Sequence, residues 1–443
     1  MRFSVLAVIA FCWTASCCFG SEPDWPRVEQ HATELLQRYI GIASINPPAD
    51  TSEAARFLQN ELTAAGLDPK LYPSGPGGKT NLVARLPGKD RSAKPLLLLN
   101  HMDVVPVDAS RWKKKPFGGE IDEGQIWGRG SLDMKSTAVI QLTALILLKQ
   151  LGIVPQRDIV FVSTCDEESG GVSGASWMIQ NHWDEMNPEY VLDEGGVGSH
   201  DVYSPDKLIF GIAVADKQVL WLKLHVTGTA GHGSQPIPDN ANDRLLNAIE
   251  KAKAFPPSAK SSPVVADMRS AVGTFADNKF INAVQVNTMS LTSLRSGVGD
   301  PPRPNVIPSV AEATLDCRLL PGQNAEEFVS DIKARINDPQ VTVERVSPKP
   351  DDPQPSSTDT PLYRAIKAAL VKAHPGATVM PMVVPFGTDA QKFRMRKVPA
   401  YGLIPMVVDT ATLATMHSDS EHIPLEQFKK GLHIYFDLLR SSY

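Results

Sequence analysis

Cysteine is scarce in this chain of 443 residues, which contains only five. Cys12, Cys17 and Cys18 lie near the amino terminus, so Cys165 and Cys317 are the only two in the remainder. These two fall in segments that we assign to different domains, and we therefore expect no disulfide between them. Stability must come from buried hydrophobic cores, and a chain of this length at 42% hydrophobic residues can build two of them.

Several other features are missing as well. Basic residues form no dense run beyond Lys113 to Lys115, and the formal net charge of −5 becomes −6 once a leader carrying Arg2 is removed. This charge balance argues against nucleic acid as a partner. The chain also lacks a Gly-x-Ser-x-Gly nucleophile elbow, which argues against a serine hydrolase. No internal repeat or low-complexity tract is visible.

One long apolar stretch is present, from Phe3 to Phe19 after Arg2. It has the outline of a secretory signal peptide over residues 1–20, and it is too short and too early for a membrane-spanning helix. We therefore expect a secreted or periplasmic protein with no transmembrane anchor. The alternative is a lipoprotein, because small residues at 14–16 precede Cys17, which could carry a lipid anchor.

Helical and strand patterns alternate over the first half of the chain. Helical patterns span Val28–Tyr39, Ser52–Ala65 and Lys135–Leu151, and buried-strand patterns span Leu96–Leu99, Ile159–Ser163 and Tyr190–Leu192. Such alternation predicts an α/β fold with a parallel-rich sheet. Acidic residues and a histidine follow the strand patterns, at the sheet edge where open α/β folds bind their ligands.

The pattern changes near Lys217 to alternating strands. We expect strands at Val219–Val226, Ala283–Leu291, Ala311–Leu320 and Val341–Val346, with helices at Leu245–Lys253 and Ala325–Ile336. This predicts an inserted α+β domain, ferredoxin-like in class, over residues 217–347. It would interrupt a catalytic domain made of residues 21–216 and 348–443. The second part should contain helices at Pro361–Ala373 and Leu425–Leu439 and a strand at Val398–Ile404.

Histidine and acidic residues occur in five short phrases. They are His101 and Asp103 in Asn-His-Met-Asp-Val-Val-Pro, Asp133 in Gly-Arg-Gly-Ser-Leu-Asp-Met-Lys, Glu167 and Glu168 in Asp-Glu-Glu-Ser-Gly-Gly, Glu194 in Leu-Asp-Glu-Gly, and His417 in Met-His-Ser-Asp-Ser-Glu. Two imidazoles and several carboxylates suit a catalytic zinc site, and extra carboxylates allow a second ion to share a bridging ligand. The set therefore indicates a metal-dependent amide hydrolase.

Each residue also has an ordinary interpretation when it is taken alone. His417 could be an exposed loop histidine, Asp133 a helix N-cap and Glu194 a surface acid. Asp193, next to Glu194, could face a metal in its place. Asp103 could be a turn residue before Pro106. The metal site is favoured because all five phrases occur together in one chain and in this order.

In order and wording the phrases resemble the M20 metallopeptidase family, and the resemblance covers nearly all of the chain after the leader. It implies that His101, Asp133 and Glu194 hold one metal ion. It also implies that Asp133 bridges to a second ion held by Glu168 and His417, with Glu167 as the general base. Two divalent ions are expected, with zinc first and cobalt or manganese as alternatives.

Asp103 is the expected acceptor for the second ring N–H of His101, which would fix the histidine tautomer. The resemblance further implies that His232, in Gly-His-Gly-Ser, crosses the interface of a lid-mediated homodimer to support an oxyanion. Asn305, Arg318 and Thr388 match positions that bind the substrate. The ordinary alternatives are a turn histidine for His232 and an ion pair with Asp316 for Arg318.

The chain departs from the family pattern at two places. Gln391 follows Thr388-Asp389-Ala390 where many relatives carry arginine, although Arg394 remains, and Ser418 follows His417 where glycine is more usual. The phrases are most similar to the aminoacylase and carboxypeptidase S branch, which implies an N-acyl amino acid or a short peptide as substrate. A dipeptidase or carboxypeptidase is the alternative. A non-catalytic binding protein is less consistent with the chain, because it would have no need for Glu167.

Overall fold

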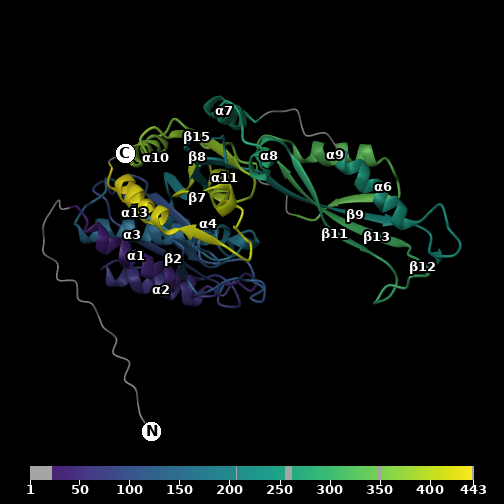
Figure 1. Ribbon diagram of the computed structural model, residues 1–443, viewed down its shortest axis with the longest axis horizontal. Helices are drawn as coiled ribbons and strands as arrows, with labels where there is room; N and C mark the ends of the chain where they lie inside the picture. Colours follow the sequence, from purple (N-terminus) through teal and green to yellow (C-terminus); the bar gives the residue numbers. More distant parts are fainter. Residues whose placement is uncertain (1–21, 206, 255–261, 348–351, 442–443) are drawn as a thin grey trace, which may run out of the picture.

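The computed structural model describes residues 22–205, 207–254, 262–347 and 352–441. The expected signal peptide and Cys17 lie outside these ranges. Within them, no helix combines the length and apolar character needed to cross a bilayer. The early and late parts of the chain together form one lobe, and the lid strands form a second lobe beside it (Figure 1).

The first lobe is built on an eight-stranded sheet in the order β1-β2-β6-β3-β7-β16-β8-β15. Its strands are β1 (Lys70–Pro73), β2 (Thr80–Leu86), β3 (Leu96–His101), β6 (Ile159–Thr164), β7 (Tyr190–Ser199), β8 (Ile209–Asp216), β15 (Thr378–Val384) and β16 (Ala400–Val407). The central neighbours β6, β3, β7 and β16 run parallel, and antiparallel pairings occur outside them. The predicted parallel-rich α/β class is confirmed.

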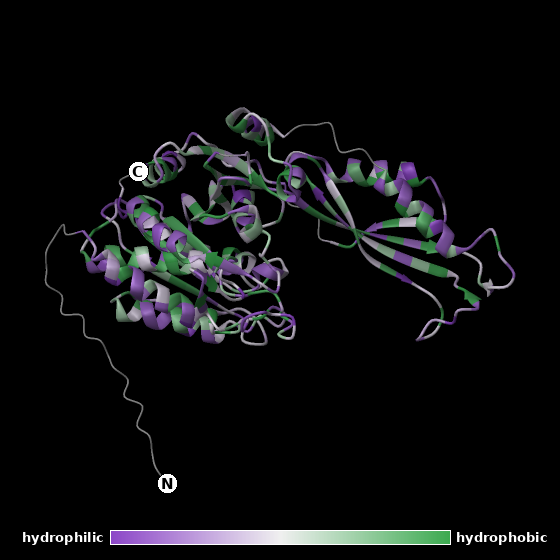
Figure 2. Cartoon of the chain, in the orientation of Figure 1, coloured by the Kyte–Doolittle hydropathy of each residue, from purple (hydrophilic) through white to green (hydrophobic). Residues whose placement is uncertain are grey.

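Helices cover both faces of this sheet. One face carries α1 (Trp25–Ile40), α2 (Ser52–Ala64), α3 (Lys135–Gln150), α10 (Pro361–Ala373) and α13 (Leu425–Arg440), and the other carries α4 (Ala175–Asn181), α5 (Trp183–Met186) and α11 (Ala390–Met395). Leu96 and Leu98 pack toward the first set of helices, whereas Leu97 and Leu99 pack toward the second. Because helices cover both faces of the sheet, the sequences of its central strands are continuous apolar runs. Figure 2 shows these hydrophobic strands between the helix layers.

The second lobe, the lid, has the chain order β9 (Gln218–Thr227), α6 (Ala241–Lys253), β11 (Thr288–Ser296), β13 (Val310–Leu319), α9 (Ala325–Ile336) and β14 (Val341–Arg345). Its antiparallel sheet has the order β11-β13-β9-β14, which is the arrangement of a ferredoxin-like βαββαβ unit. Leu220, Leu222 and Leu224 share a separate core with α6 and α9. Hydrophobic and hydrophilic bands alternate along the lid strands (Figure 2).

The strand predicted at Ala283–Leu291 is wrong in its first half. Residues up to Gln285 belong to helix α8 (Lys279–Gln285), and β11 begins only at Thr288. Ile281 and Val284, three positions apart, are buried in the core of the first lobe. Helix α7 (Pro263–Val272), which the sequence reading missed, packs against β15 and β8. Residues 263–285, inside the span expected for the lid, therefore pack on the first lobe.

Lys217 and Gln218, where β8 leads into β9, make hydrogen bonds to other segments that pass between the two lobes. The Lys217 ammonium donates to the carbonyl oxygens of Ala283 (2.9 Å) and Val286 (2.8 Å). The Gln218 amide donates to the carbonyl oxygen of Gln323 at 2.8 Å. Burial lowers the pKa of Lys217 to about 7. The lid is thus attached to the first lobe through a hydrogen-bonded junction.

Candidate metal centre

Three neighbouring parallel strands bring polar side chains to one edge of the catalytic sheet. His101 is the last residue of β3, and the short 3-10 helix η1 (Glu167–Ser169) follows β6 closely. In β7, Glu194 lies two positions beyond Leu192, the last residue that pairs with β3. Because the carboxyl ends of parallel strands meet at one edge, residues distant in sequence become neighbours there.

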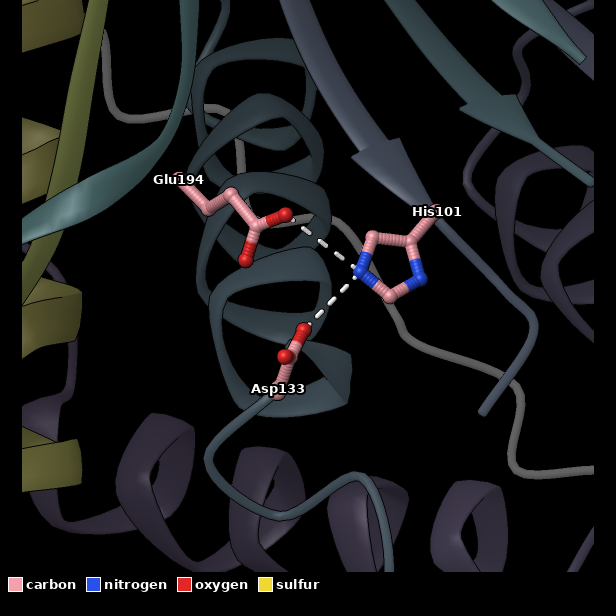
Figure 3. Close-up of side chains that lie close together, drawn as sticks. All are labelled: His101, Asp133 and Glu194. Carbon is pink, nitrogen blue, oxygen red and sulfur yellow. Dashed lines mark hydrogen bonds and ion pairs between the residues drawn. The ribbon is translucent and has the colours of Figure 1, made fainter. Parts of the chain in front are cut away.

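The first set of possible metal ligands joins His101, Asp133 and Glu194. The Nε2 atom of His101 lies 2.9 Å from Oδ1 of Asp133 and 3.4 Å from Oε1 of Glu194. Figure 3 shows both carboxylates directed at that ring nitrogen, with Asp133 supplied by the turn before α3. All three residues are buried.

The second set joins Asp133, Glu168 and His417. The Nε2 atom of His417 lies 3.0 Å from Oδ2 of Asp133 and 3.3 Å from Oε2 of Glu168. The two oxygens of Asp133 thus face different histidines, which is the arrangement of a bridging carboxylate. His417 has a φ of 62°, in the left-handed region, and this conformation belongs to the loop between α12 (Thr410–Leu413) and β17 (His422–Pro424).

The electrostatics of the two sets fit divalent cations. Burial, followed by the charge of Asp133, raises the pKa of Glu194 well above its usual range, and the same two causes raise the pKa of Glu168. Oε1 of Glu168 is buried and has no hydrogen-bond partner among the described residues. Crowded buried carboxylates need positive charge close by, and imidazole nitrogens with carboxylate oxygens are the donors that zinc and similar ions bind.

The backbone of Asp103 fixes the His101 tautomer. The Nδ1 atom of His101 lies 2.9 Å from the carbonyl oxygen of Asp103, and 3.6 Å from that residue's carboxylate. Since a carbonyl oxygen only accepts, Nδ1 carries the proton and Nε2 presents its lone pair to the first set. The sequence led us to expect the Asp103 side chain as the acceptor, but the short contact is made by its main chain.

The carboxylate of Asp103 instead holds the turn that carries the two glutamates. It accepts the backbone N–H groups of Glu167 and Glu168, each at 3.1 Å. It also accepts the side-chain amide of Asn46 at 2.7 Å. Three donors directed at one buried carboxylate favour its ionised form. Burial opposes this, but the contact and charge of His101, followed by the bonds from Asn46 and the Glu168 N–H, lower the pKa of Asp103.

Asn46 was missed in the sequence reading. Its amide also donates to Asp166 at 3.3 Å, and its oxygen accepts the Ser169 hydroxyl at 2.9 Å. This one buried side chain therefore joins Asp103 to both ends of the acidic turn. Its only sequence signal is the Asn-Pro-Pro triplet, which is typical of a turn and carries no chemistry.

Glu167 lies beside the ligand sets without belonging to either. Burial of its carboxyl group, opposed by His101 and reinforced by Glu194, raises its pKa well above the usual range. A carboxyl group held in such a place is suited to exchange a proton near neutral pH.

The lid places His232 and Asn305 together at one end. His232 lies in β10 (Gly231–His232), which pairs with β12 (Val306–Ile307), and the carbonyl oxygen of Asn305 accepts the Gly233 N–H at 2.7 Å. This end follows β9, whose ten residues from Gln218 to Thr227 cover about 30 Å at 3.3 Å per residue. It is therefore the end remote from the junction with the catalytic lobe, as Figure 1 shows.

Arg318 and Thr388 make contacts within the chain. The Arg318 guanidinium binds both oxygens of Asp316, at 2.8 and 3.1 Å, which is the pairing considered as its alternative. The Thr388 hydroxyl donates to Asp216 at 3.3 Å. Arg394 also binds Asp216, at 2.8 Å, with both side chains buried. In this structure the Arg394 guanidinium therefore forms a buried ion pair inside the first lobe.

A lidded α/β sheet with two histidine and carboxylate sets that share one aspartate is an arrangement typical of metal-dependent hydrolases. The family model described as peptidase family M20/M25/M40 matches residues 97–441. The chain therefore belongs to this peptidase family, whose members depend on metal ions, and it is a hydrolase.

Individual relatives agree with this assignment. The chain is 28% identical over 396 residues to a probable carboxypeptidase S-like 2 of Dictyostelium discoideum, covering 82% of this chain and 74% of that one. It is 27% identical over 420 residues to mouse aminoacylase-1, covering 94% and 96%. The solved M20 family metallo-carboxypeptidase Sso-CP2 of Sulfolobus solfataricus has the same fold, with a TM-score of 0.71, 18% identity and coverage of 92% and 98%.

Proposed function

We propose that this hydrolase cleaves an amide bond next to a free carboxylate, in an N-acyl amino acid or a short peptide. The observation that carries the proposal is the sharing of Asp133 between the two ligand sets, with the half-buried Glu167 beside them. Amide hydrolysis requires a nucleophilic water, a polarised carbonyl group and a proton for the leaving nitrogen.

In the proposed site, His101, Asp133 and Glu194 would hold one divalent ion, and Asp133, Glu168 and His417 would hold the other. When bound, such ions lower the pKa of a water molecule and polarise the substrate carbonyl. Zinc is the first choice for this donor set, and cobalt or manganese are alternatives. The ordered Nδ1–H of His101 and the Asp103 contacts to the acidic turn prepare these side chains for the ions.

Glu167 is the proposed general base and then the general acid. It takes a proton as the water oxygen forms its bond to the carbonyl carbon, and it returns that proton to nitrogen as the C–N bond breaks. The second proton of the water stays on the new hydroxyl group and is released when the product acid ionises, which leaves a carboxylate and a free amine. The raised pKa of Glu167, caused mainly by burial, supports a residue that both accepts and donates a proton.

His232 is proposed to act on the partner subunit of a homodimer that forms through the lid. Its exposed side chain lies at the remote end of the lid, with Nδ1 3.1 Å from the Ser234 N–H as acceptor. Nε2 is then free to carry the proton and to donate to the oxyanion that develops as water adds. Asn305 would join it there, while Arg318 and Thr388 would bind the substrate carboxylate or line its pocket after the lid closes.

The relatives guide the choice of substrate. Similarity to aminoacylase-1 covers nearly the whole chain and favours an N-acyl amino acid. Similarity to a carboxypeptidase S-like protein and to a metallo-carboxypeptidase supports the second candidate, a dipeptidase or carboxypeptidase. The test is hydrolysis by the zinc-loaded mature protein of N-acetyl-methionine against a panel of dipeptides, with Glu167→Gln as the inactive control.

We also propose export, supported by the leader sequence at residues 1–20. Mass spectrometry of the protein recovered after expression in a secreting host would give the cleavage site. A mature chain that begins near Ser21 supports a secreted or periplasmic enzyme, and a lipid-modified Cys17 supports the lipoprotein alternative.

A further inference from the structure

A buried ion pair joins the two irregular segments that carry Asp133 and His417. Oε2 of Glu421 accepts a hydrogen bond from the Arg129 guanidinium at 2.5 Å, and the exposed fractions of these side chains are 0% and 2%. Both residues lie inside the phrases that contain Asp133 and His417, but the sequence assigned neither of them a role. In sequence, Glu421 follows His417 by four positions, and Arg129 precedes Asp133 by four.

Glu421 holds the Asp133 turn. Its Oε1 atom accepts the backbone N–H groups of Leu132 at 2.9 Å and of Asp133 at 3.2 Å. Asp133 is the residue whose two oxygens face both histidines, so a shift of its backbone would move the shared ligand.

Arg129 holds the His417 loop. Its second terminal nitrogen donates to the carbonyl oxygen of His417 at 3.3 Å, and its guanidinium lies 5.3 Å from the ring centre of Trp112. The backbone sets the pair in place, because the Gly128 N–H donates to the carbonyl oxygen of Glu421 at 3.0 Å. Beyond it, β17 pairs with β5 (Gln125–Trp127). Two ligands separated by 284 positions are thus joined by one pair of charges.

We propose that Arg129 and Glu421 are positioning residues for the second metal ion, an inference that rests on the proposed metal centre. Each member of the pair reaches one ligand of the second set, whereas the first set is reached only through Asp133. The pair should therefore set the affinity for the ion at Asp133, Glu168 and His417 more than the affinity at His101, Asp133 and Glu194. Groups that orient metal ligands typically change metal affinity by 10- to 100-fold when they are replaced.

The test is a zinc titration of the metal-free mature protein against a competing chelator, with affinities assigned by the variants Glu194→Gln and His417→Ala. In Glu421→Gln the amide cannot accept from both Arg129 and the two backbone N–H groups. We expect its second-site dissociation constant to rise about 10- to 100-fold, with a smaller rise at the first site. Arg129→Lys keeps the charge and loses the bond to His417, so it should weaken the second site alone. If Glu421→Gln does not fold, Arg129→Lys alone tests the proposal.

Asp216→Asn is the matched control. The Arg394–Asp216 pair has the same burial, 2% and 0%, and lies outside both ligand sets. This variant should lose thermal stability and keep both zinc affinities. If Glu421→Gln and Arg129→Lys also lose only stability, the pair is merely structural and the proposal is overturned. If the wild-type protein does not bind two ions, the proposed metal centre itself fails and the positioning role fails with it.

Discussion

The carboxylate of Asp103 accepts the backbone N–H of Glu167 at 3.1 Å, while its own carbonyl oxygen accepts the ring N–H of His101 at 2.9 Å. One residue thus orients a proposed metal ligand through its main chain and the proposed catalytic base through its side chain. This relationship makes the geometry of the acidic turn depend on Asp103.

Asp103→Asn should impair catalysis and metal binding together. The new amide nitrogen would face an N–H group, either that of Glu167 or that of Glu168, and it would lose a charge-assisted bond at that point. We expect zinc affinity to fall about 10- to 100-fold and kcat to stay reduced at saturating zinc. Zinc titration and steady-state kinetics measure the two effects. If Asp103→Asn regained the wild-type kcat at saturating zinc, the role of Asp103 would be confined to holding the metal ions.

Asn46→Ala should lower kcat as Asp103→Asn does, but to a smaller extent, without altering any proposed metal ligand. The substitution removes bonds to Asp103, Asp166 and Ser169. Because these bonds hold the acidic turn, we expect kcat to fall more than KM changes. The comparison variant is Ser92→Ala, whose hydroxyl bonds the exposed Asp90, and it should keep wild-type kinetics. If Asn46→Ala and Ser92→Ala had the same kinetics, Asn46 would have no role in positioning the acidic turn for catalysis.

Metal removal should destabilise the folded protein. Burial and repulsion from Asp133 act on Glu194 and Glu168 when no cation balances them. A ligand that binds only the folded state adds about 2.7 kcal/mol at a concentration 100 times its Kd. Differential scanning fluorimetry should therefore show a lower Tm after chelation and recovery with zinc. An unchanged Tm in both steps would argue against ions held by the folded chain.

Mixing two inactive variants should restore activity if His232 works across a dimer. His232→Ala and Glu167→Gln, unfolded together and refolded as an equal mixture, would form heterodimers in which one site has both intact residues. Random pairing then predicts about one quarter of wild-type activity. Each variant refolded alone is the control and should remain inactive. A mixture no more active than its components would exclude action on the partner subunit.

Lys217 should make the junction between the lobes sensitive to pH. Its pKa is lowered by burial from the ordinary 10.5 to about 7, so between these values the unfolded chain binds more protons than the folded one. The contribution of Lys217 to stability therefore rises with pH from about 7 to 10.5. Urea unfolding should show that the stability difference between wild type and Lys217→Met grows over this range. A constant difference would mean that the Lys217 pKa is the same in both states.

The sequence predicts much of the fold because local patterns and burial agree. Leu96 to Leu99 form a continuous apolar run, and the structure buries alternate members on opposite faces of the sheet. The run therefore indicated a central strand and, at its end, the position of His101. The M20 membership and the hydrolase class are confirmed as well, since five ordered phrases depend little on packing.

Tertiary contacts explain what the sequence could not predict. Residues up to Gln285 read as strand in a segment rich in β-branched residues, yet packing against the catalytic lobe makes them helical. Asn46 and the Arg129–Glu421 pair act through backbone groups of other segments, and no residue pattern records such contacts. The proposed action of His232 across a homodimer also depends on a second subunit, which one sequence does not display.

The most direct measurement is amino acid release from N-acetyl-methionine and a dipeptide panel, using purified mature protein that has been stripped of metal and reloaded with zinc. The account predicts hydrolysis that disappears on chelation, returns with zinc, and falls by about 10²- to 10⁴-fold in Glu167→Gln while that variant still binds zinc. Zinc-loaded wild-type protein that cleaves none of these amides, or Glu167→Gln with undiminished activity, would contradict the proposed function.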